Sequence, residues 1–449
     1  MSTFNTNTTT VLAYGKSHLT LHLPAGVEAT ILEKQKATNR PENTPSEATL
    51  ISQALAHPIG GEGCTIASAS VNQKTACILI CDITRPVPNS LFLRPIVNQL
   101  LGGGIHLEAI TILIATGLHR PNLNDELVEL ISDKWILEHV NIVNNDARDD
   151  NAFVDLGFTS SQVPVKLNRL FVNADVKIAT GLVEPHFMAG FSGGRKVISP
   201  GVAHHTTIRT FHSARFMEDV HATSCNLVSN PLHEAQLEIV DMVKARDNGH
   251  DILALNTVLD AERKLVAATF GEIIASHLAA VQYVRSSAEL AVSRRFGTVV
   301  TSAGGYPLDK TYYQTVKGMV TPLDVLSPGG TLIICSECSE GMGSHEFVKA
   351  QESLLNLGPT AFLKTLTNKS LADIDEWQTE ELLKSINVGR VVLFAPTLDS
   401  DAATGVERTN DLDSAVRDAV ERWRMQGGEE GMAVIPEGPY VVPFYRTKT

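Results

Sequence analysis

Residues 76–86 read ACILICDITRP, in which six apolar residues run without interruption into a polar turn. A run that is apolar at every position is typical of a strand buried on both faces of a parallel sheet, whereas a half-exposed strand alternates. Five further runs share this pattern and are separated by helical stretches: AITILIATG at 109–117, DVKIATG at 175–181, TVVTSAGG at 298–305, TLIICSEC at 331–338 and RVVLFAP at 390–396. The sequence therefore predicts an α/β fold with mostly parallel sheets flanked by helices.

The chain is long enough for more than one domain. Its 449 residues correspond to two or three domains at about 150 residues each. A helical stretch at 286–297, SSAELAVSRRFG, leads into the new strand at 298–305 and indicates a boundary there. We expect an N-terminal α/β domain at 1–288 and a C-terminal α/β domain at 289–430. The extended tail at 431–449 is expected to pack back on the first domain.

Composition and charge exclude several classes of protein. The chain has an ordinary globular composition, with 43% hydrophobic and 19% charged residues, and its net charge of −13 argues against nucleic acid as a partner. The printed sequence has no apolar run of about 18 residues that predicts a membrane span, and its first residues lack the pattern of a secretion signal. Six cysteines are too few for a disulfide scaffold, and Cys335 and Cys338 are interpreted as buried thiols. We expect a cytoplasmic protein.

Polar residues collect directly after four of the predicted strands. Asp82 and Arg85 follow the first, His119 follows the second, and His186 follows the third. The fourth is followed by a Gly-Gly turn and then by DKTYYQTVKGM at 309–319. Because ligands bind beyond the carboxyl ends of parallel strands, we expect these side chains to line one site.

The stretch at 184–201, EPHFMAGFSGGRKVISPG, is too polar and too interrupted by glycine and proline to be core. It does not match a nucleoside-triphosphate loop, because Lys196 does not follow a glycine and Val197 stands where a hydroxyl group should bind magnesium. The Ser-Gly-Gly turn at 192–194 can still direct backbone N–H groups at a single phosphate. A dinucleotide site has no support, since no G-x-G-x-x-G follows a strand.

The histidines leave both a metal site and an acid–base pair open. His119, His186, His204, His205 and His212 are candidate metal ligands, but no H-E-x-x-H or comparable helical spacing joins them. His119 and His186 can instead flank a substrate, one removing a proton and the other returning it on the opposite face. A racemase or an epimerase needs that arrangement.

Three residues suit the carboxylate of a substrate. Arg85 offers a planar fork of donors that matches a carboxylate. Gln314 and Lys317 lie three residues apart, so on one face of a helix they can reach the same anion from the second domain. The sequence therefore predicts an active site in a cleft between the two domains.

These motifs resemble those of the nickel-dependent lactate racemase family. The matching elements are D-x-T-R-P at 82–86, T-G-x-H-R-P at 116–121, E-P-H-x-x-x-G-F-S-G-G-x-K at 184–196 with P-G at 200–201, His212, and Q-x-x-K at 314–317. They cover most of the chain in the family's order. The resemblance implies a racemase or epimerase that inverts C2 of a lactate-like 2-hydroxy acid by proton-coupled hydride transfer to a nickel-pincer nucleotide.

The cofactor implied by the resemblance is a pyridinium-3-thioamide-5-thiocarboxylic acid mononucleotide, in which a carbon and two sulfur atoms hold Ni(II). By the same likeness, His119 and His186 are catalytic, His212 binds the nickel, and Lys196 is where some members tether the cofactor covalently. The resemblance further implies substrate contacts at Asp82, Arg85, Gln314, Lys317 and Trp377, and cofactor contacts at Lys196, Thr84, Ser192, Gly193 and Gly194. The enzymes that make the cofactor are the implied transient partners.

The sequence leaves the substrate and two other function classes open. Leu118, Met188 and Tyr306 are candidates for setting the size of the pocket. Arg120 and Arg195 can serve a second carboxylate, the cofactor phosphate or a helix end, and we favour the last two. The other classes are a zinc-dependent hydrolase, which needs further metal ligands and an activated water, and a non-catalytic protein that binds a nucleotide or an organic acid, which needs no acid–base pair.

Overall fold

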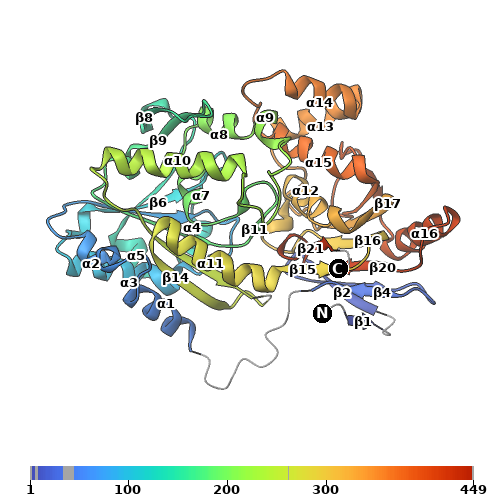
Figure 1. Ribbon diagram of the computed structural model, residues 1–449, viewed down its shortest axis with the longest axis horizontal. Helices are drawn as coiled ribbons and strands as arrows, with labels where there is room; N and C mark the ends of the chain where they lie inside the picture. Colours follow the sequence, from blue (N-terminus) through green and yellow to red (C-terminus); the bar gives the residue numbers. More distant parts are fainter. Residues whose placement is uncertain (1–2, 6–8, 34–44, 261, 447–449) are drawn as a thin grey trace.

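The computed structural model describes residues 3–5, 9–33, 45–260 and 262–446. They form two α/β halves that lie side by side in Figure 1. The first half is built on a six-stranded sheet in the order β14 (Leu265–Glu272), β13 (Leu253–Leu259), β10 (Val176–Leu182), β5 (Ala76–Cys81), β6 (Ile110–Ala115) and β7 (Asn141–Asn144). All neighbouring strands in it are parallel except β13 and β14. The expected α/β class with mostly parallel strands is confirmed.

The strands of the first sheet are apolar throughout because helices cover both of its faces. Leu79 of β5 packs on one face with residues of α7 (Arg195–Ile198) and α10 (Pro231–Arg246). Ile78 and Ile80 pack on the other face, against α1 (Glu47–Ala56) and α3 (Asn89–Gly102). In Figure 1, α10 lies above this sheet and α1 below it. Every side chain from 76 to 80 is buried, as a doubly covered strand requires.

The second half is built on a seven-stranded sheet that includes strands from both ends of the chain. Its order is β1 (Thr3–Asn5), β4 (Ala29–Ile31), β20 (Met432–Ile435), β16 (Phe296–Ser302), β17 (Leu326–Cys335), β18 (Arg390–Phe394) and β19 (Glu407–Thr409). Its strands are parallel except for the β1–β4 pair. Cys335 and Cys338 are buried free thiols at the end of β17, as expected.

The remaining helices and hairpins cover the two sheets. Helix α10 shows how the sequence sets a helix start, since Asn230 accepts hydrogen bonds from the backbone N–H groups of Leu232 and His233, and Pro231 follows it. The other helices are α2 (Ile66–Ala69), α4 (Asp125–Ile131), α5 (Lys134–His139), α6 (Arg169–Val172), α8 (His205–Phe211), α9 (Ala214–Met217), α11 (Ile273–Ala288), α12 (Tyr312–Val320), α13 (His345–Leu357), α14 (Pro359–Thr367), α15 (Glu376–Val388) and α16 (Leu412–Met425). The small sheets pair β2 (Thr9–Tyr14) with β3 (Ser17–His22), β8 (Phe153–Phe158) with β9 (Pro164–Asn168), and β11 (Pro185–His186) with β12 (Gly190–Phe191). None of the described helices is long and apolar enough to cross a lipid bilayer.

The junction near residue 288 differs from the expected helix. Helix α11 ends at Ala288, and the next four residues form strand β15 (Glu289–Val292). They pair in parallel with β21 (Val442–Tyr445) of the tail, and this tertiary pairing overrides a local pattern that favours helix. The prediction of helix over this segment was therefore wrong.

The expected domain limits stay a prediction. The two ends of the chain contribute strands to the second sheet, and the C-terminal tail also contacts the first half. Strands β1 and β4 precede residue 288 but belong to the second sheet, and β20 of the tail lies beside β4 in that sheet. Val442 of the tail packs against the first half, in a cluster with Val183 and Phe191. The tail therefore contacts both halves.

The buried face of β5 generates a stability prediction. Ile78→Ala should lower the free energy of unfolding by about 2–5 kcal/mol, because the cavity left in a doubly covered sheet cannot collapse. Urea unfolding of the purified variants measures it. Val220→Ala at an 80% exposed position is the control and should stay within about 0.5 kcal/mol of wild type. Equal losses in the two variants would contradict a tightly packed β5.

Candidate active site

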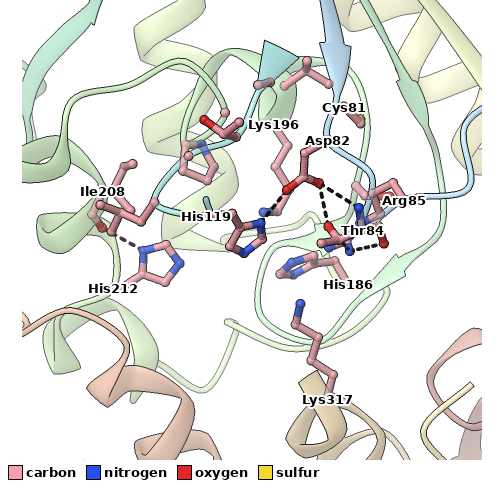
Figure 2. Close-up of a pocket in the computed structure, with 18 of the residues that line it drawn as sticks. Cys81, Asp82, Thr84, Arg85, His119, His186, Lys196, Ile208, His212 and Lys317 are labelled. Atoms are coloured by element: carbon pink, nitrogen blue, oxygen red, sulfur yellow. Dashed lines mark hydrogen bonds and ion pairs between the residues drawn. The ribbon is translucent and has the colours of Figure 1, made fainter. Parts of the chain in front are cut away.

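One pocket gathers the polar residues that follow β5, β6 and β10. The loops after these strands and helices α7 and α8 supply most of its wall (Figure 2). The second half supplies Tyr313 and Lys317 from α12, and Asp375, Trp377 and Gln378 from the start of α15. The pocket therefore lies in the cleft between the two halves, as the sequence predicts.

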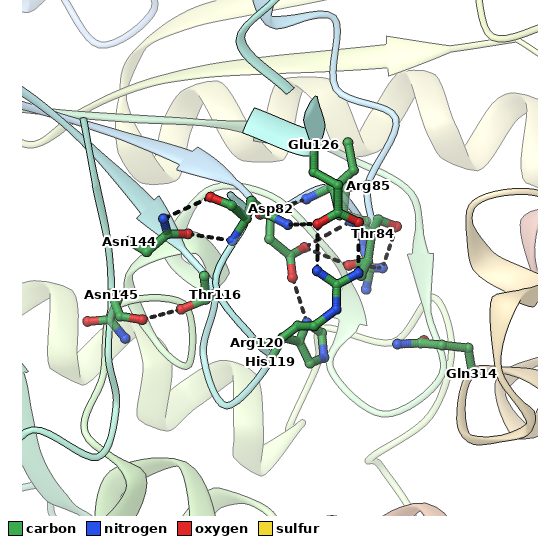
Figure 3. Close-up of polar contacts among 12 residues, drawn as sticks. Asp82, Thr84, Arg85, Thr116, His119, Arg120, Glu126, Asn144, Asn145 and Gln314 are labelled. Atoms are coloured by element: carbon green, nitrogen blue, oxygen red, sulfur yellow. Dashed lines mark hydrogen bonds and ion pairs between the residues drawn. The ribbon is translucent and has the colours of Figure 1, made fainter. Parts of the chain in front are cut away.

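Asp82 is fixed by the turn that follows β5. Its Oδ1 accepts hydrogen bonds from the hydroxyl group of Thr84 at 2.6 Å and from the backbone N–H of Thr84 at 3.3 Å. Its Oδ2 lies 2.6 Å from Nδ1 of His119 (Figure 3). Burial raises the pKa of Asp82, but His119, Thr84 and Arg85 outweigh it and hold the pKa below its usual value. The carboxylate is therefore ionised at neutral pH.

The contact with Asp82 decides which nitrogen of His119 faces the ligand. An ionised carboxylate only accepts hydrogen bonds, so Nδ1 of His119 carries the proton. Nε2 then keeps its lone pair. The side chain of His119 is 38% exposed, so this lone pair is accessible to a ligand in the pocket. His119 is thus arranged as a proton acceptor whose cation Asp82 would stabilise.

His186 has the opposite tautomer. Its Nδ1 accepts the backbone N–H groups of Ala189 at 3.2 Å and Met188 at 3.4 Å, so the neutral ring carries its proton on Nε2. Burial lowers the pKa of His186 well below its usual value, and Lys196 and Lys317 lower it further. The short β11–β12 hairpin holds both the ring and the two amides. The pocket therefore contains one imidazole set to accept a proton and one set to donate a hydrogen bond.

His212 is a buried neutral imidazole at the end of α8. Its Nδ1 donates to the carbonyl oxygen of Ile208 at 2.7 Å, so the lone pair is on Nε2. Burial lowers the pKa of His212 to about 3. The ring lies 4.4 Å from that of Trp377, measured between centroids. A neutral imidazole with a fixed tautomer is the form that binds a metal.

The amine of Lys196 lines the pocket from the first turn of α7. Burial lowers the pKa of Lys196 to about 7, and the charges of Arg85 and Arg195 add to the effect. An ordinary lysine titrates near 10.4. Part of the Lys196 amine is therefore uncharged, and so nucleophilic, near neutral pH.

Two further cations face the same pocket. Arg85 lies 3.4 Å from Glu184, measured from Nε to Oε1, and Lys317 donates to Oε1 of Gln314 at 2.5 Å. Burial lowers the pKa of Lys317 well below its usual value, and Arg85 and Lys196 lower it further. The crowding of these cations makes an anion the favoured ligand.

Most of the residues expected from the sequence line this pocket, and two do not. The lining includes Asp82, Thr84, Arg85, His119, His186, Ser192, Gly193, Lys196, His212, Lys317 and Trp377. Gln314 is buried and accepts a hydrogen bond from Lys317, which lines the pocket. In Figure 3 its side chain extends toward the side of His119. Gly194 lies behind it, where its N–H donates to Oδ1 of Asn256 at 3.0 Å.

Most polar groups of the Ser-Gly-Gly turn at 192–194 already form hydrogen bonds within the protein. The hydroxyl of Ser192 donates to the carbonyl of Leu182 at 2.7 Å and accepts the N–H of Glu184 at 3.0 Å. The backbone N–H of Ser192 donates to the carbonyl of Glu184. With the Gly194 N–H bound to Asn256, two of the three amides expected to cradle a phosphate already have protein partners.

Sequence reasoning missed several residues of the wall. Tyr313, Asp375 and Gln378 come from the second half, and Cys81 and Phe187 stand next to residues of the motifs. Tyr313 precedes Gln314 in the chain, and Asp375 lies two residues before Trp377. Adjacency to an expected residue was the available signal, but only the folded cleft shows that these side chains face the others.

The residues whose roles the sequence left open have structural partners. Arg195 is fully buried and donates to main-chain oxygens of its own loop, while Arg120 forms a two-pronged pair with Glu126 at 2.5 and 2.7 Å. His204 caps α8 and lies 2.8 Å from Asp150. Leu118 and Met188 line the pocket, but Tyr306 lines a separate cavity, so its expected influence on pocket size was wrong.

Comparison with known families adds to this geometry. The family model of the lactate racemase N-terminal domain matches residues 14–224, and the family model of the lactate racemase C-terminal domain matches residues 293–442. The chain belongs to the lactate racemase family. The lactate racemase of Lactiplantibacillus plantarum is 31% identical over 435 residues, which cover 96% of this chain and 98% of that protein. The lactate racemase of Thermoanaerobacterium thermosaccharolyticum is 29% identical over the same shares.

Solved structures agree with the fold. The lactate racemase apoprotein of T. thermosaccharolyticum matches with a TM-score of 0.83 and 28% identity, over 97% of this chain and 99% of that one. A Thermotoga maritima protein matches with a TM-score of 0.60 at 17% identity, over 86% of this chain and 99% of that one, which shows a shared fold alone. This protein is therefore a racemase, an enzyme of the isomerase class.

The lowered pKa of Lys196 predicts unusual chemistry in the racemase without cofactor. Cyanate, a small reagent that reacts with unprotonated amines, should modify Lys196 at a rate that rises as the pH increases through about 7, because the Lys196 amine loses its proton in that range. Peptide mass spectrometry across a pH series gives the profile. Lys134, whose side chain is 87% exposed, is the internal reference, and its rate is followed in the same samples. Identical profiles for the two lysines would contradict the electrostatic account of the pocket.

Proposed function

We propose that this racemase interconverts the two C2 configurations of a lactate-like 2-hydroxy acid and uses a nickel-pincer nucleotide as its cofactor. The family uses a nickel cofactor, and two lactate racemases resemble the chain over 96% of its length. The observation that carries the proposal is one pocket with three imidazoles of fixed tautomer: His119 and His212 keep a lone pair on Nε2, and His186 carries its proton there.

The donor set of the pocket fits the proposed cofactor. His212 offers the lone pair of a neutral imidazole, which would bind the nickel. Lys196 offers an amine that is partly uncharged at neutral pH, which would form the thioamide tether. The expected phosphate cradle fits less well, because the backbone amides of Ser192 and Gly194, on either side of Gly193, already have protein partners.

The cations of the pocket suit the carboxylate of the substrate. Arg85 has a planar fork of donors, and Lys317 adds a point charge from the second half. A bound carboxylate would relieve the mutual repulsion of Arg85, Lys196 and Lys317. The same anion would raise the lowered pKa of Lys317, so binding draws a proton from solution.

The histidines deal with the hydroxyl proton of the substrate. When bound, the cofactor supplies a hydride acceptor and donor, so that no carbanion need form at C2. His119 takes the hydroxyl proton at Nε2 while Asp82 stabilises the resulting imidazolium. His186 presents its Nε2–H to the oxygen from a second position. The oxidised substrate is a planar 2-keto acid, and reduction at either face, with a proton returned to the oxygen by a histidine, would give either configuration.

The zinc hydrolase alternative has less support. In the part of the chain that the structure describes, the group whose donors lie close enough for a three-residue metal site is Asp150, His204 and His205. None of these three lines the pocket. A simple binding protein would need neither the His119–Asp82 pair nor the opposite tautomer of His186.

Nickel analysis tests the proposal directly. Protein produced together with the enzymes that make the cofactor should contain close to one nickel per chain, and protein produced without them close to none. His212→Ala should lose at least about tenfold in nickel content, since it removes the protein ligand. Elemental analysis of both preparations gives the result. No nickel despite verified cofactor production, or equal zinc in the two preparations, would sink the proposal.

Removing an acid–base residue should separate chemistry from cofactor binding. His119→Ala should slow racemisation of a single enantiomer by about 10²–10⁴-fold, because it removes the proton acceptor. Its nickel content should match that of wild type. Chiral chromatography of the reaction and elemental analysis of the same sample measure both quantities. A variant with near-normal turnover would show that His119 is not the base.

A further inference from the structure

Asp375 is held in an unusual position at the edge of the pocket. It precedes α15 with φ +64° and ψ −1°, a left-handed conformation that a residue with a side chain rarely adopts. An aspartate at a helix start usually accepts a backbone N–H of the first turn, but the Asp375 side chain makes no such bond. The carboxylate lines the pocket instead.

Hydrogen bonds from the second half fix the Asp375 carboxylate. The hydroxyl of Ser344, which caps α13, donates to Oδ2 at 2.5 Å. Tyr313 also bonds to it through its hydroxyl group. Because Oη of Tyr313 accepts the Trp377 N–H at 3.0 Å, its own proton is free to go to Asp375. Two donors therefore orient an acceptor that is only partly buried.

Asp375 places an acidic group on the wall of a pocket that Arg85 and Lys317 make suitable for the substrate carboxylate. Burial raises the pKa of Asp375, while Ser344, His119 and Tyr313 oppose the rise. Asp375 lines the same pocket as the acid–base pair of His119 and His186. A substrate whose carboxylate binds Arg85 and Lys317 would have two orientations in the pocket. In one of them, the substituent on C2 would face Asp375.

We propose that Asp375 selects the substrate: the favoured 2-hydroxy acid is a monocarboxylate that carries a further hydroxyl group at C3 or beyond. This inference rests on the proposed racemase function and names its substrate class. A hydroxyl on the substituent would donate to a lone pair of the Asp375 carboxylate that Ser344 and Tyr313 leave open. A methyl group would displace water from this partly buried carboxylate and offer it no hydrogen bond in return. A second carboxylate would meet a like charge in a partly desolvated pocket.

Three acids of similar size separate these cases on the nickel-loaded enzyme: glycerate, lactate and malate. Glycerate should exceed lactate in kcat/KM by about tenfold or more, since a hydrogen bond to a charged group discriminates by that amount. Malate should fall below glycerate by about 100-fold. Calorimetric affinities of the three acids should follow the same order, and they can be measured whether or not an acid is turned over.

Asp375→Asn tests the residue itself. Asparagine also tolerates the left-handed conformation, so the start of α15 should persist. The malate-to-lactate ratio of kcat/KM should rise by about tenfold or more, because the repelling charge is gone. The glycerate-to-lactate ratio should fall, because an amide oxygen is a weaker acceptor than a carboxylate. Ratios cancel any general loss of activity in the variant.

Asp373→Asn is the matched control, two residues away on the same segment. Its side chain is 65% exposed and pairs with Lys369 and Arg209 outside the pocket wall, so both ratios should stay within about twofold of wild type. Unchanged ratios in Asp375→Asn, or wild-type malate turnover equal to that of lactate, would overturn the role of Asp375. If loaded enzyme racemises none of the acids, the proposed function fails, and the affinities alone then decide on Asp375.

Discussion

The buried guanidinium of Arg195 holds the loop on which the pocket depends. It donates to the carbonyl oxygens of Phe191 and Ala189, each at 3.0 Å, and to Nδ1 of His233 at 2.9 Å. These partners are neutral, so burial lowers the pKa of Arg195 to about 9 while its hydrogen bonds compensate the lost water. Lys196 is its neighbour in the chain, and the segment it holds leads back to His186. The reactive side chains are therefore positioned by a cation that itself stays out of the pocket.

The pocket concentrates positive charge in an acidic protein. The chain carries a net charge of −13, yet Arg85, Lys196 and Lys317 meet at one cleft with lowered pKa values for both lysines. Such an arrangement is unfavourable until an anion enters, and it is typical of a site in which ligand binding repays stored repulsion. Asp82 offsets part of this charge, because it acts on Arg85 and Lys317 as well as on His119.

The sequence predicts the first half of the site better than the second. Asp82, His119 and His186 follow uninterrupted apolar strands, and the carboxyl ends of parallel strands must share an edge, so their meeting follows from the pattern. The approach of α15 depends instead on how two sheets pack, and no local pattern reports it. For that reason Trp377 was reached through family likeness and Asp375 was not reached at all.

The same limit explains the misread segment after α11. The residues that form β15 have no strand signal of their own, and their partner β21 lies at the other end of the chain. Intrinsic preference decides structure only where distant contacts do not. The tautomers of His119 and His186 are a further case, since they follow from single hydrogen bonds that folding creates.

The pairing of β4 with β20 has a consequence for the order of folding. It joins Ile31 to Val434, so one of the first strands to leave the ribosome waits for one of the last before its sheet closes. The first half, with all six strands of its sheet between residues 76 and 272, meets no such delay. During synthesis, the side of the pocket that the first half supplies can therefore fold before the second half is complete. The side chains of α12 and α15 would then pack against a surface that is already folded.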